Sequence, residues 1–364
     1  MTRIPERLKV SPFFAFYLVQ AIQIGVGILG FQRLLTKAAG NDAWISILFA
    51  GIGVHVIIWM TYKILDKQEG DITDVHKILF GKWIGAALSL LLIMYLSLLS
   101  ITILRTYIEV VQVWIFPGIR ISLFSASILI IVFYVVNGGL RTVTGMAVLG
   151  VILPAYLLFS LFYPLKYSFF ENLLPIFDHS ILEILQSTKQ VTLSILGFET
   201  LLFYYPFLKE ARKSQKWAHL GSASTIFVYL AVMVVSTAYF SEEQLMRNIW
   251  ATLTMLKIVE LPFVERVEYV AISSWLFVIL PNICLAIWAA SRGLKRILNK
   301  KQRPMVVLLL IFVCVVSCTL RTREQVDMLN NYTAQIGFFL IYGYIPFLFL
   351  FSTVYYRIKG RKST

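Results

Sequence analysis

Charged side chains are scarce in this sequence, since Asp, Glu, Lys and Arg make up 14% of its 364 residues, against about a quarter in an average globular domain. Cysteines are equally few. The three, Cys284, Cys314 and Cys318, lie in apolar runs and form no CxxC pair. The shortage of cysteine excludes a disulfide framework or a zinc site, and the shortage of charge argues against a soluble enzyme, a nucleic-acid binder or a disordered scaffold.

Apolar residues, by contrast, make up 59% of the chain. This is more than one soluble core can bury, so the sequence predicts an all-α integral membrane protein forming a single transmembrane domain over residues 1–364. At about 20 residues per helix, the apolar runs supply about ten spans. We expect them near residues 11–37, 43–62, 83–114, 121–137, 143–165, 187–208, 217–240, 262–290, 305–320 and 333–356.

Two connections carry helical patterns of their own. The link 66–82 places Asp71 before an amphipathic pattern, which predicts a short capped helix on the membrane surface. The link 241–261 begins with a capping-box sequence at Ser241 and continues with apolar residues at helical spacing. We expect this second link to form a helical flap over the outer side of the membrane-embedded part.

The net charge of +14 follows from how the basic residues are distributed. Lys and Arg concentrate in the terminal segments and in the connections on the same side of the membrane as the N-terminus. The positive-inside rule therefore predicts that both termini are cytoplasmic. Topology accounts for the basic excess, and no nucleic-acid partner is needed to explain it.

The first span contains the sequence GVGILG at residues 25–30, which matches the GxGxxG spelling of a dinucleotide site. Such a site needs a preceding strand and a βαβ unit, whereas this sequence lies inside a helical apolar run. Gly25 and Gly27 instead allow the helix to unwind in mid-membrane, where freed backbone groups must line a cavity. Close helix packing at the glycines is an equal alternative.

A second break is predicted five spans later. Residues 194–200 place Gly197 at mid-depth of the sixth span, beside the carboxylate of Glu199. Interrupted helices at matching places in two halves are typical of inverted-repeat transporters that bind their ligand at the midplane. The expected fold is therefore an inverted 5+5 arrangement with broken helices 1 and 6, whose repeats cover about residues 11–165 and 187–356.

Several segments together resemble the B subunits of bacterial spore germinant receptors, over nearly the whole chain. They are GVGIL at 25–29, GKWIG at 81–85, LGFE at 196–199, FVERVE at 263–268 and GLK at 293–295. The resemblance implies the ten-helix fold of the amino acid–polyamine–organocation superfamily. It also implies a nutrient sensor in the spore inner membrane, in complex with a larger A-type membrane subunit and a C-type lipoprotein.

In this fold the pocket lies between spans 1, 3, 6 and 8. The broken helix would offer N–H donors to a carboxylate such as that of an amino acid. The phenol of Tyr95 and the amide of Asn282, which follows a proline, would add polar contacts. The predicted ligand-binding residues are Gly25, Val26, Gly27, Ile28, Tyr95, Leu99, Leu196, Gly197, Phe198, Glu199 and Asn282.

Ionisable residues inside spans are costly and point to function. Glu199 has two interpretations: it meets a ligand ammonium, or it stabilises the break by pairing with a protein cation or accepting from freed N–H groups. Arg105 and Glu109 are spaced i,i+4 and predict an internal ion pair. Glu265, Arg266 and Glu268 open the eighth span beneath the flap, as either gating residues or a solvated helix start.

The sequence therefore predicts the ligand-recognition subunit of a germinant receptor, with no enzyme activity, catalytic residue, metal or cofactor. The rival is an amino acid permease coupled to H⁺ or Na⁺, for which no lysine or clear hydroxyl cluster is found near Pro154 in the fifth span. A channel or scaffold with a vestigial pocket is a third alternative, because few polar groups line the predicted site.

Overall fold

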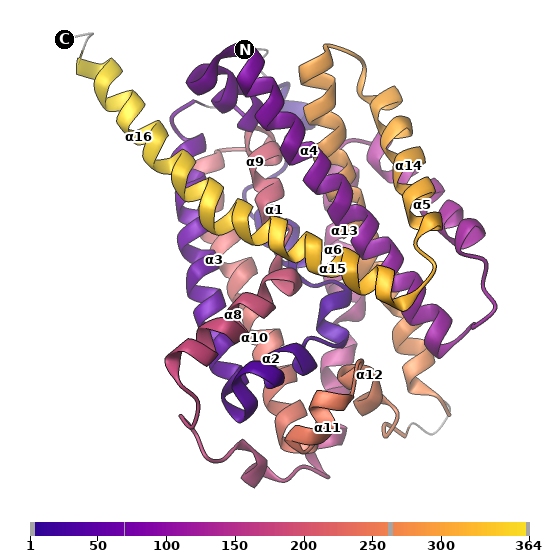
Figure 1. Ribbon diagram of the computed structural model, residues 1–364. Helices are drawn as coiled ribbons and strands as arrows, with labels where there is room; N and C mark the ends of the chain where they lie inside the picture. The colour runs from indigo at the N-terminus through magenta and orange to yellow at the C-terminus, as the bar shows by residue number, and fades with distance from the viewer. Residues whose placement is uncertain (1–3, 69, 261–264, 362–364) are drawn as a thin grey trace.

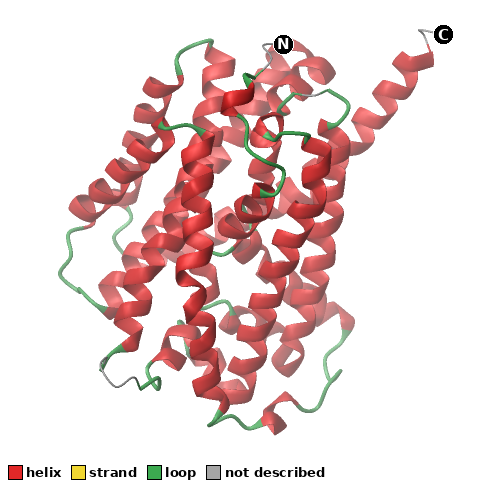
Figure 2. Ribbon diagram, turned by 180° about the vertical axis from the view of Figure 1, so that it is seen from behind, coloured by secondary structure: helices red, strands yellow, loops and turns green. Residues whose placement is uncertain are grey.

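The computed structural model describes residues 4–68, 70–260 and 265–361. Within these residues the secondary structure is helical, and strand-like pairing is limited to one isolated bridge between Val10 and Leu208 (Figure 2). This bridge joins the segment before the first α-helix to the last residue of the sixth predicted span. It contains two backbone hydrogen bonds, from Val10 to Phe207 and from Lys209 to Val10.

The first half of the chain consists of α-helices of very different length, interrupted by 3-10 segments and short turns. These are α1 (Phe14–Gln23), the 3-10 turn η2 (Val26–Leu29), α2 (Gln32–Ala39), α3 (Ala43–Leu65), α4 (Ile72–Trp114), α5 (Ile121–Asn137), α6 (Leu140–Ile152), the 3-10 segment η4 (Leu153–Leu161) and α7 (Phe162–Leu165).

The second half follows the same pattern. Its elements are α8 (Ile181–Ile195), the 3-10 turn η6 (Phe198–Thr200), α9 (Leu201–Tyr204), α10 (Gln215–Tyr239), α11 (Glu242–Arg247), α12 (Ala251–Leu256), α13 (Val267–Leu298), α14 (Gln302–Thr319), α15 (Arg323–Phe338), the π-helical η9 (Phe339–Tyr344) and α16 (Ile345–Arg361).

Seven helical stretches of the described chain are long and apolar enough to cross a membrane. They match seven of the predicted spans. The other three fall short for visible reasons: the first and sixth are interrupted, and the fourth is the 17-residue α5. The count of ten and the 5+5 repeat stay predictions, while the all-helical, membrane-spanning character is clear.

Both linking segments contain helices. The 66–82 link becomes the first part of α4, where Asp71 Oδ1 accepts a hydrogen bond from the Thr73 N–H at 3.1 Å. Gly81 has a φ of 79° and bends this part away from the membrane span. The apolar face of the bent segment is buried, so it packs against the bundle with one side.

The 241–261 link forms α11 and α12, with the predicted capping box at Ser241 in place. Its last residue, Leu261, and residues 262–264 of the predicted eighth span lie outside the described residues. Both chain ends are found at one end of the bundle, and α11 and α12 are found at the opposite end (Figure 1). We use "flap" below for residues 242–256.

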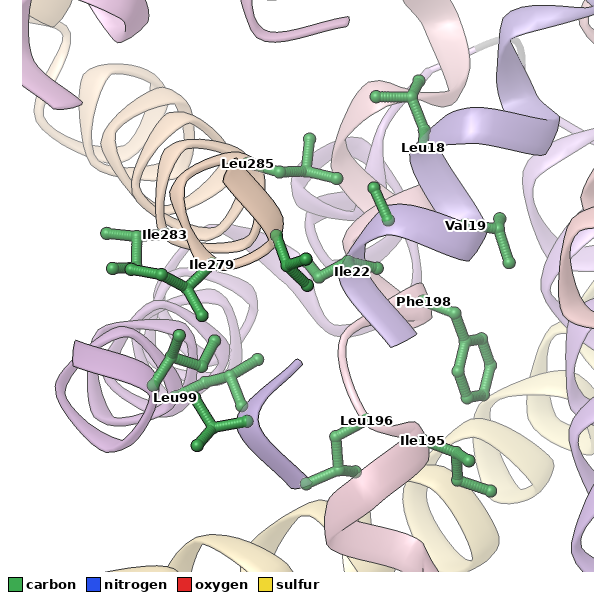
Figure 3. Close-up of a cluster of buried hydrophobic side chains, with 14 of the residues drawn as sticks. Leu18, Val19, Ile22, Leu99, Ile195, Leu196, Phe198, Ile279, Ile283 and Leu285 are labelled. Atoms are coloured by element: carbon green, nitrogen blue, oxygen red, sulfur yellow. The ribbon is translucent and has the colours of Figure 1, made fainter. Parts of the chain in front are cut away.

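The core lies around α13, which packs along α4 and also contacts α1, α5, α6 and α14. At its centre, side chains of the interrupted helices pack against α4 and α13 (Figure 3). They are Leu18, Val19 and Ile22 of α1, Leu99 of α4, Ile195 of α8, Leu196 directly after it, Phe198 of η6, and Ile279, Ile283 and Leu285 of α13.

Candidate functional site

The first span is broken where the glycines predict it. Helix α1 ends at Gln23, Ile24 and Gly25 are extended, and the chain resumes as the 3-10 turn η2. The packing alternative also holds at one glycine, because a Cβ on Gly27 would lie 2.9 Å from Ser194 Oγ on α8. The two broken helices thus meet at Gly27.

The sixth predicted span is broken at Gly197. This residue has a φ of 108°, in the left-handed region, and a Cβ there would lie 2.5 Å from Ile22 Cγ1. Both the backbone conformation and the contact require glycine. The result is that α8 stops at Ile195 directly against the end of α1.

The breaks free backbone carbonyls, and side chains of other helices donate to them. Asn282 Nδ2 donates to the Ile24 carbonyl at 3.1 Å, and Trp275 Nε1 donates to the Gly25 carbonyl at 3.3 Å. Both donors lie on α13. The irregular backbone is therefore satisfied by the protein itself, as a membrane environment requires.

Glu199 is buried and holds the second break together. Its Oε1 accepts from the Tyr95 hydroxyl at 2.5 Å, and its Oε2 accepts from the Gly197 N–H at 2.8 Å. Both carboxylate oxygens therefore have protein partners. Of the two interpretations of Glu199, this geometry favours the structural one, with the freed N–H of the break as a partner.

A cavity of about 290 Å³ lies beside the first break. It is bounded by residues of α1, η2, α2, α4, α8, α13, α15 and the flap. Of the predicted ligand-binding residues, six line it: Gly25, Val26, Gly27, Leu99, Leu196 and Asn282. We name this space the break cavity.

The break cavity contains two buried oxygen acceptors without hydrogen-bond donors among the described residues. They are Gln23 Oε1 and Asn282 Oδ1. Each amide uses its nitrogen to bond a backbone carbonyl, Gln23 to Ile195 at 3.4 Å and Asn282 to Ile24, so their oxygens are fixed in orientation. A buried acceptor left unmatched costs free energy, and both oxygens would bond a ligand donor such as an ammonium or hydroxyl.

The mouth of the break cavity is rich in cations. Arg33, Lys37 and Arg323 line it, together with one carboxylate, Asp327. Arg323 bonds both Asp327 and Glu109, with N···O distances of 3.0 and 2.5 Å. The site is thus neutral and accepting at its inner end and positively charged at its mouth.

The flap packs onto the first break. Thr252 Oγ1 donates to the Ile28 carbonyl at 2.7 Å, and Gln32 of α2 donates to the same hydroxyl at 2.7 Å. A Cβ on Gly30 would lie 2.1 Å from the Ile249 carbonyl. Together with Trp250, Ile249 forms part of the cavity wall. Any movement of the flap would therefore change the shape of the cavity.

Five predicted ligand-binding residues do not line the break cavity. Gly197, Phe198 and Glu199 lie at the second break, Tyr95 of α4 bonds Glu199 there, and Ile28 lines a different cavity. A ligand contact at these five residues stays a prediction.

The predicted ion pair of Arg105 with Glu109 is replaced by tertiary contacts. Glu109 bonds Arg323, and Arg105 Nε donates to the Leu320 carbonyl at 2.7 Å; among the described residues the two show no direct salt bridge. The reason is that both side chains face α15 and the turn before it. At the start of α13, Arg266 bonds the buried Glu268 at 2.9 Å, while Glu265 is exposed; none of the three lines the cavity.

Several residues of the site escaped the sequence analysis. Gln23 was detectable, because an amide in an apolar span is unusual. Trp275, Thr252 and Arg323 carried no local signal, since each acts through a contact with a segment far away in the chain.

Comparison with known proteins identifies the family of this chain. The family model for spore germination proteins matches residues 9–326. The chain belongs to the spore germination protein family. It is 46% identical to spore germination protein GerQB of Bacillus cereus, over the full length of both chains. It is 25% identical to spore germination protein A2 of Bacillus subtilis (strain 168), covering 94% of this chain and 95% of the relative.

Among solved structures, the fold is similar to that of a Na⁺-coupled sialic acid symporter in a substrate-bound, outward-open state. The TM-score is 0.69 at 13% identity, covering 95% of this chain and 79% of the symporter. This likeness shows a transporter-like fold for a member of the spore germination family. The membership confirms the resemblance inferred from the sequence, and the known relatives are germination proteins rather than enzymes.

Proposed function

We propose that this chain is the nutrient-sensing subunit of a germinant receptor, and that the break cavity holds the nutrient. The observation that carries this proposal is the pair of unmatched acceptors, Gln23 Oε1 and Asn282 Oδ1, at the inner end of a cavity with a cationic mouth. An amino acid fits this polarity, with its ammonium toward the two oxygens and its carboxylate toward the arginines.

The signal would pass through the flap. A ligand that prefers one arrangement of the break shifts the population toward it, and the contacts of Thr252 and Ile249 extend that arrangement to the flap. In the proposed assembly the chain spans the spore inner membrane with both termini cytoplasmic. The partners would be an A-type membrane subunit and a C-type lipoprotein, as the relatedness to germination proteins supports.

The rival function is that of a cation-coupled amino acid transporter. In such folds, carbonyls at the end of a half-helix coordinate the coupling ion. Here the carbonyls of Ile24 and Gly25 accept hydrogen bonds from Asn282 and Trp275. One lone pair of each carbonyl is thus used by a neutral donor, which supports a sensor over a sodium-coupled carrier.

The test uses spores lacking this gene, scored for germination on single amino acids, sugars and nucleosides, with uptake of the same labelled compounds measured in vegetative membranes. We expect loss of response to one nutrient with uptake unchanged. Intact germination with lost uptake would overturn the proposal in favour of the transporter.

Variants of the gene, returned to the spores that lack it, then locate the nutrient site. Gln23→Met should raise the half-maximal nutrient concentration about tenfold, because one ligand hydrogen bond is lost. Gln112→Met is the matched control, since that amide also bonds a carbonyl, of Ile119 at 3.3 Å, but lies outside the cavity. An equal effect of both variants, or none from Gln23→Met at normal protein levels, would rule out the break cavity as the nutrient site.

A further inference from the structure

A second cavity, of about 150 Å³, lies on the other side of the first break. Its walls come from α1, η2, α6, η4, α7, α10, α12 and α13, and they are overwhelmingly apolar. A cavity of this volume with apolar walls stays dry and can take up a ligand the size of benzene. We name it the lateral cavity.

Gln20, which lines the lateral cavity, has a buried side-chain oxygen without a protein partner. Gln20 is 7% exposed, and its Oε1 is buried without a hydrogen-bond donor among the described residues. The hydroxyls that line the same cavity are already used: Thr252 donates to the Ile28 carbonyl, and Ser160 donates to the Leu157 carbonyl. The amide of Gln20 is thus the polar group of the cavity wall whose oxygen the described residues leave unused, in an apolar surrounding.

The outer wall of the lateral cavity is a thin section of the bundle surface. It is formed by η4, where Ala155 and Leu158 line the cavity and are also exposed on the outside. Pro154 interrupts the α-helical ladder here, and the segment continues as a 3-10 helix. Because this stretch belongs to an apolar helix long enough to span the membrane, this wall separates the cavity from lipid rather than from water.

The two cavities share the broken helix as a common wall. Ile24 and Ile28 line the lateral cavity, and Gly25, Val26 and Gly27 between them line the break cavity. Trp275 also lines the lateral cavity while its indole N–H holds the Gly25 carbonyl. An occupant of the lateral cavity would therefore press on the same backbone that forms the nutrient site.

We propose that the lateral cavity is a second ligand site, which takes a small uncharged molecule dissolved in the bilayer, mostly apolar and carrying one hydroxyl. The hydroxyl donates to Gln20 Oε1, and the apolar body fills the space between Ile24, Pro154 and Val228. A phospholipid does not fit this description, because its head group stays at the membrane interface. Occupancy biases the conformation of the broken helix, so this ligand modulates nutrient recognition without competing for the break cavity.

The test uses the full-length protein in nanodiscs and an aryl-diazirine derivative of benzyl alcohol as a photoreactive probe. Labelled residues are mapped by mass spectrometry, with benzyl alcohol or toluene as competitor. We expect saturable labelling on α1, α10 and η4. Gln20→Leu should weaken competition by benzyl alcohol about fivefold and leave competition by toluene nearly unchanged, because only the hydroxyl loses a partner.

Two further variants complete the test. Val228→Phe fills the cavity and should abolish the saturable labelling, whereas Phe159→Leu changes a lipid-exposed residue of η4 outside the cavity and should leave it intact. Labelling that is unsaturable, spreads evenly over lipid-facing helices or survives Val228→Phe would overturn the proposal. If Val228→Phe fails to fold, Gln20→Leu tests the proposal. Weaker competition by benzyl alcohol with unchanged competition by toluene supports it, and equal effects on both overturn it. This readout is direct binding, so its failure leaves the nutrient-site proposal standing.

Discussion

The hydroxyl of Tyr95 donates to Glu199 Oε1 at 2.5 Å, joining the middle of α4 to the break after α8. The second oxygen of the carboxylate accepts from the Gly197 N–H. An intramembrane carboxylate usually suggests contact with a substrate or an ion, yet both oxygens of this one are used by the protein. Glu199 therefore fixes the backbone that forms the wall of the site.

Replacing Glu199 should consequently affect stability more than ligand affinity. Glu199→Gln keeps one acceptor but presents an amide N–H₂ to one of the two donors, so we expect a loss of about 1.5–3 kcal/mol. The measurement is thermal unfolding of the detergent-solubilised protein followed by size-exclusion chromatography. Glu242→Gln, on the exposed start of α11, is the control and should leave the melting temperature unchanged.

Spores that carry folded Glu199→Gln protein should germinate with the wild-type half-maximal nutrient concentration. A large rise in that concentration at normal stability would instead assign Glu199 to the ligand.

Gly197 should tolerate no side chain. Gly197→Ala introduces a Cβ 2.5 Å from Ile22 Cγ1 in a backbone with positive φ. The left-handed conformation costs about 1–2 kcal/mol, and overpacking adds about 1–3 kcal/mol. Gly139→Ala is a control for backbone strain without a contact, because Gly139 has a φ of 83° and a ψ of −174°, another conformation that favours glycine, and open space around its Cβ. We expect the melting temperature to fall in both variants and clearly further in Gly197→Ala; equal shifts would contradict the close packing of the two breaks.

A cluster of ion pairs holds the end of the bundle where the termini lie. Arg296 bonds both oxygens of Asp74, at 2.8 and 2.5 Å, and Asp71 at 2.6 Å. Asp71 is fully buried, and its carboxylate faces this partner and Arg292 at 3.5 Å. These contacts fasten the bent first part of α4 to the end of α13.

Arg296→Lys should therefore loosen that end of the bundle, because a lysine cannot reproduce the bidentate geometry. We expect a lower melting temperature than in the wild type. We also expect hydrogen exchange to accelerate more in residues 72–80 than in the rest of α4. Arg303→Lys, an exposed residue on α14, is the matched control. Unchanged exchange in residues 72–80 would mean that apolar packing alone holds the segment.

The sequence predicts features of the fold that depend on local chemistry. Gly25 and Gly197 mark the breaks because glycine in an apolar span is a helix weakness that needs no partner to be recognised. The capping residue Ser241 and the amphipathic pattern after Asp71 predict helices outside the spans, and the structure contains both.

Features that depend on distant segments were beyond the sequence. The i,i+4 spacing of Arg105 and Glu109 suggests a pair, but Glu109 bonds Arg323, which is 214 residues away. The same holds for Glu199, whose partner Tyr95 is recognised only when α4 is placed beside the second break. Local spacing shows which groups need a partner, and the packing of helices decides which partner they find.

The phenol of Tyr229 on α10 donates to the Ser194 carbonyl at 2.7 Å and lies 3.4 Å from the Gln23 carbonyl. A single proton thus serves the last turns of both interrupted helices, one from each half of the chain. The first half cannot satisfy its Gln23 carbonyl without Tyr229, and the Ile195 carbonyl of the second half accepts its bond from Gln23 Nε2 of the first, so the two halves form one cooperative folding unit. A chain divided between them would leave each fragment with an unmet acceptor in the membrane.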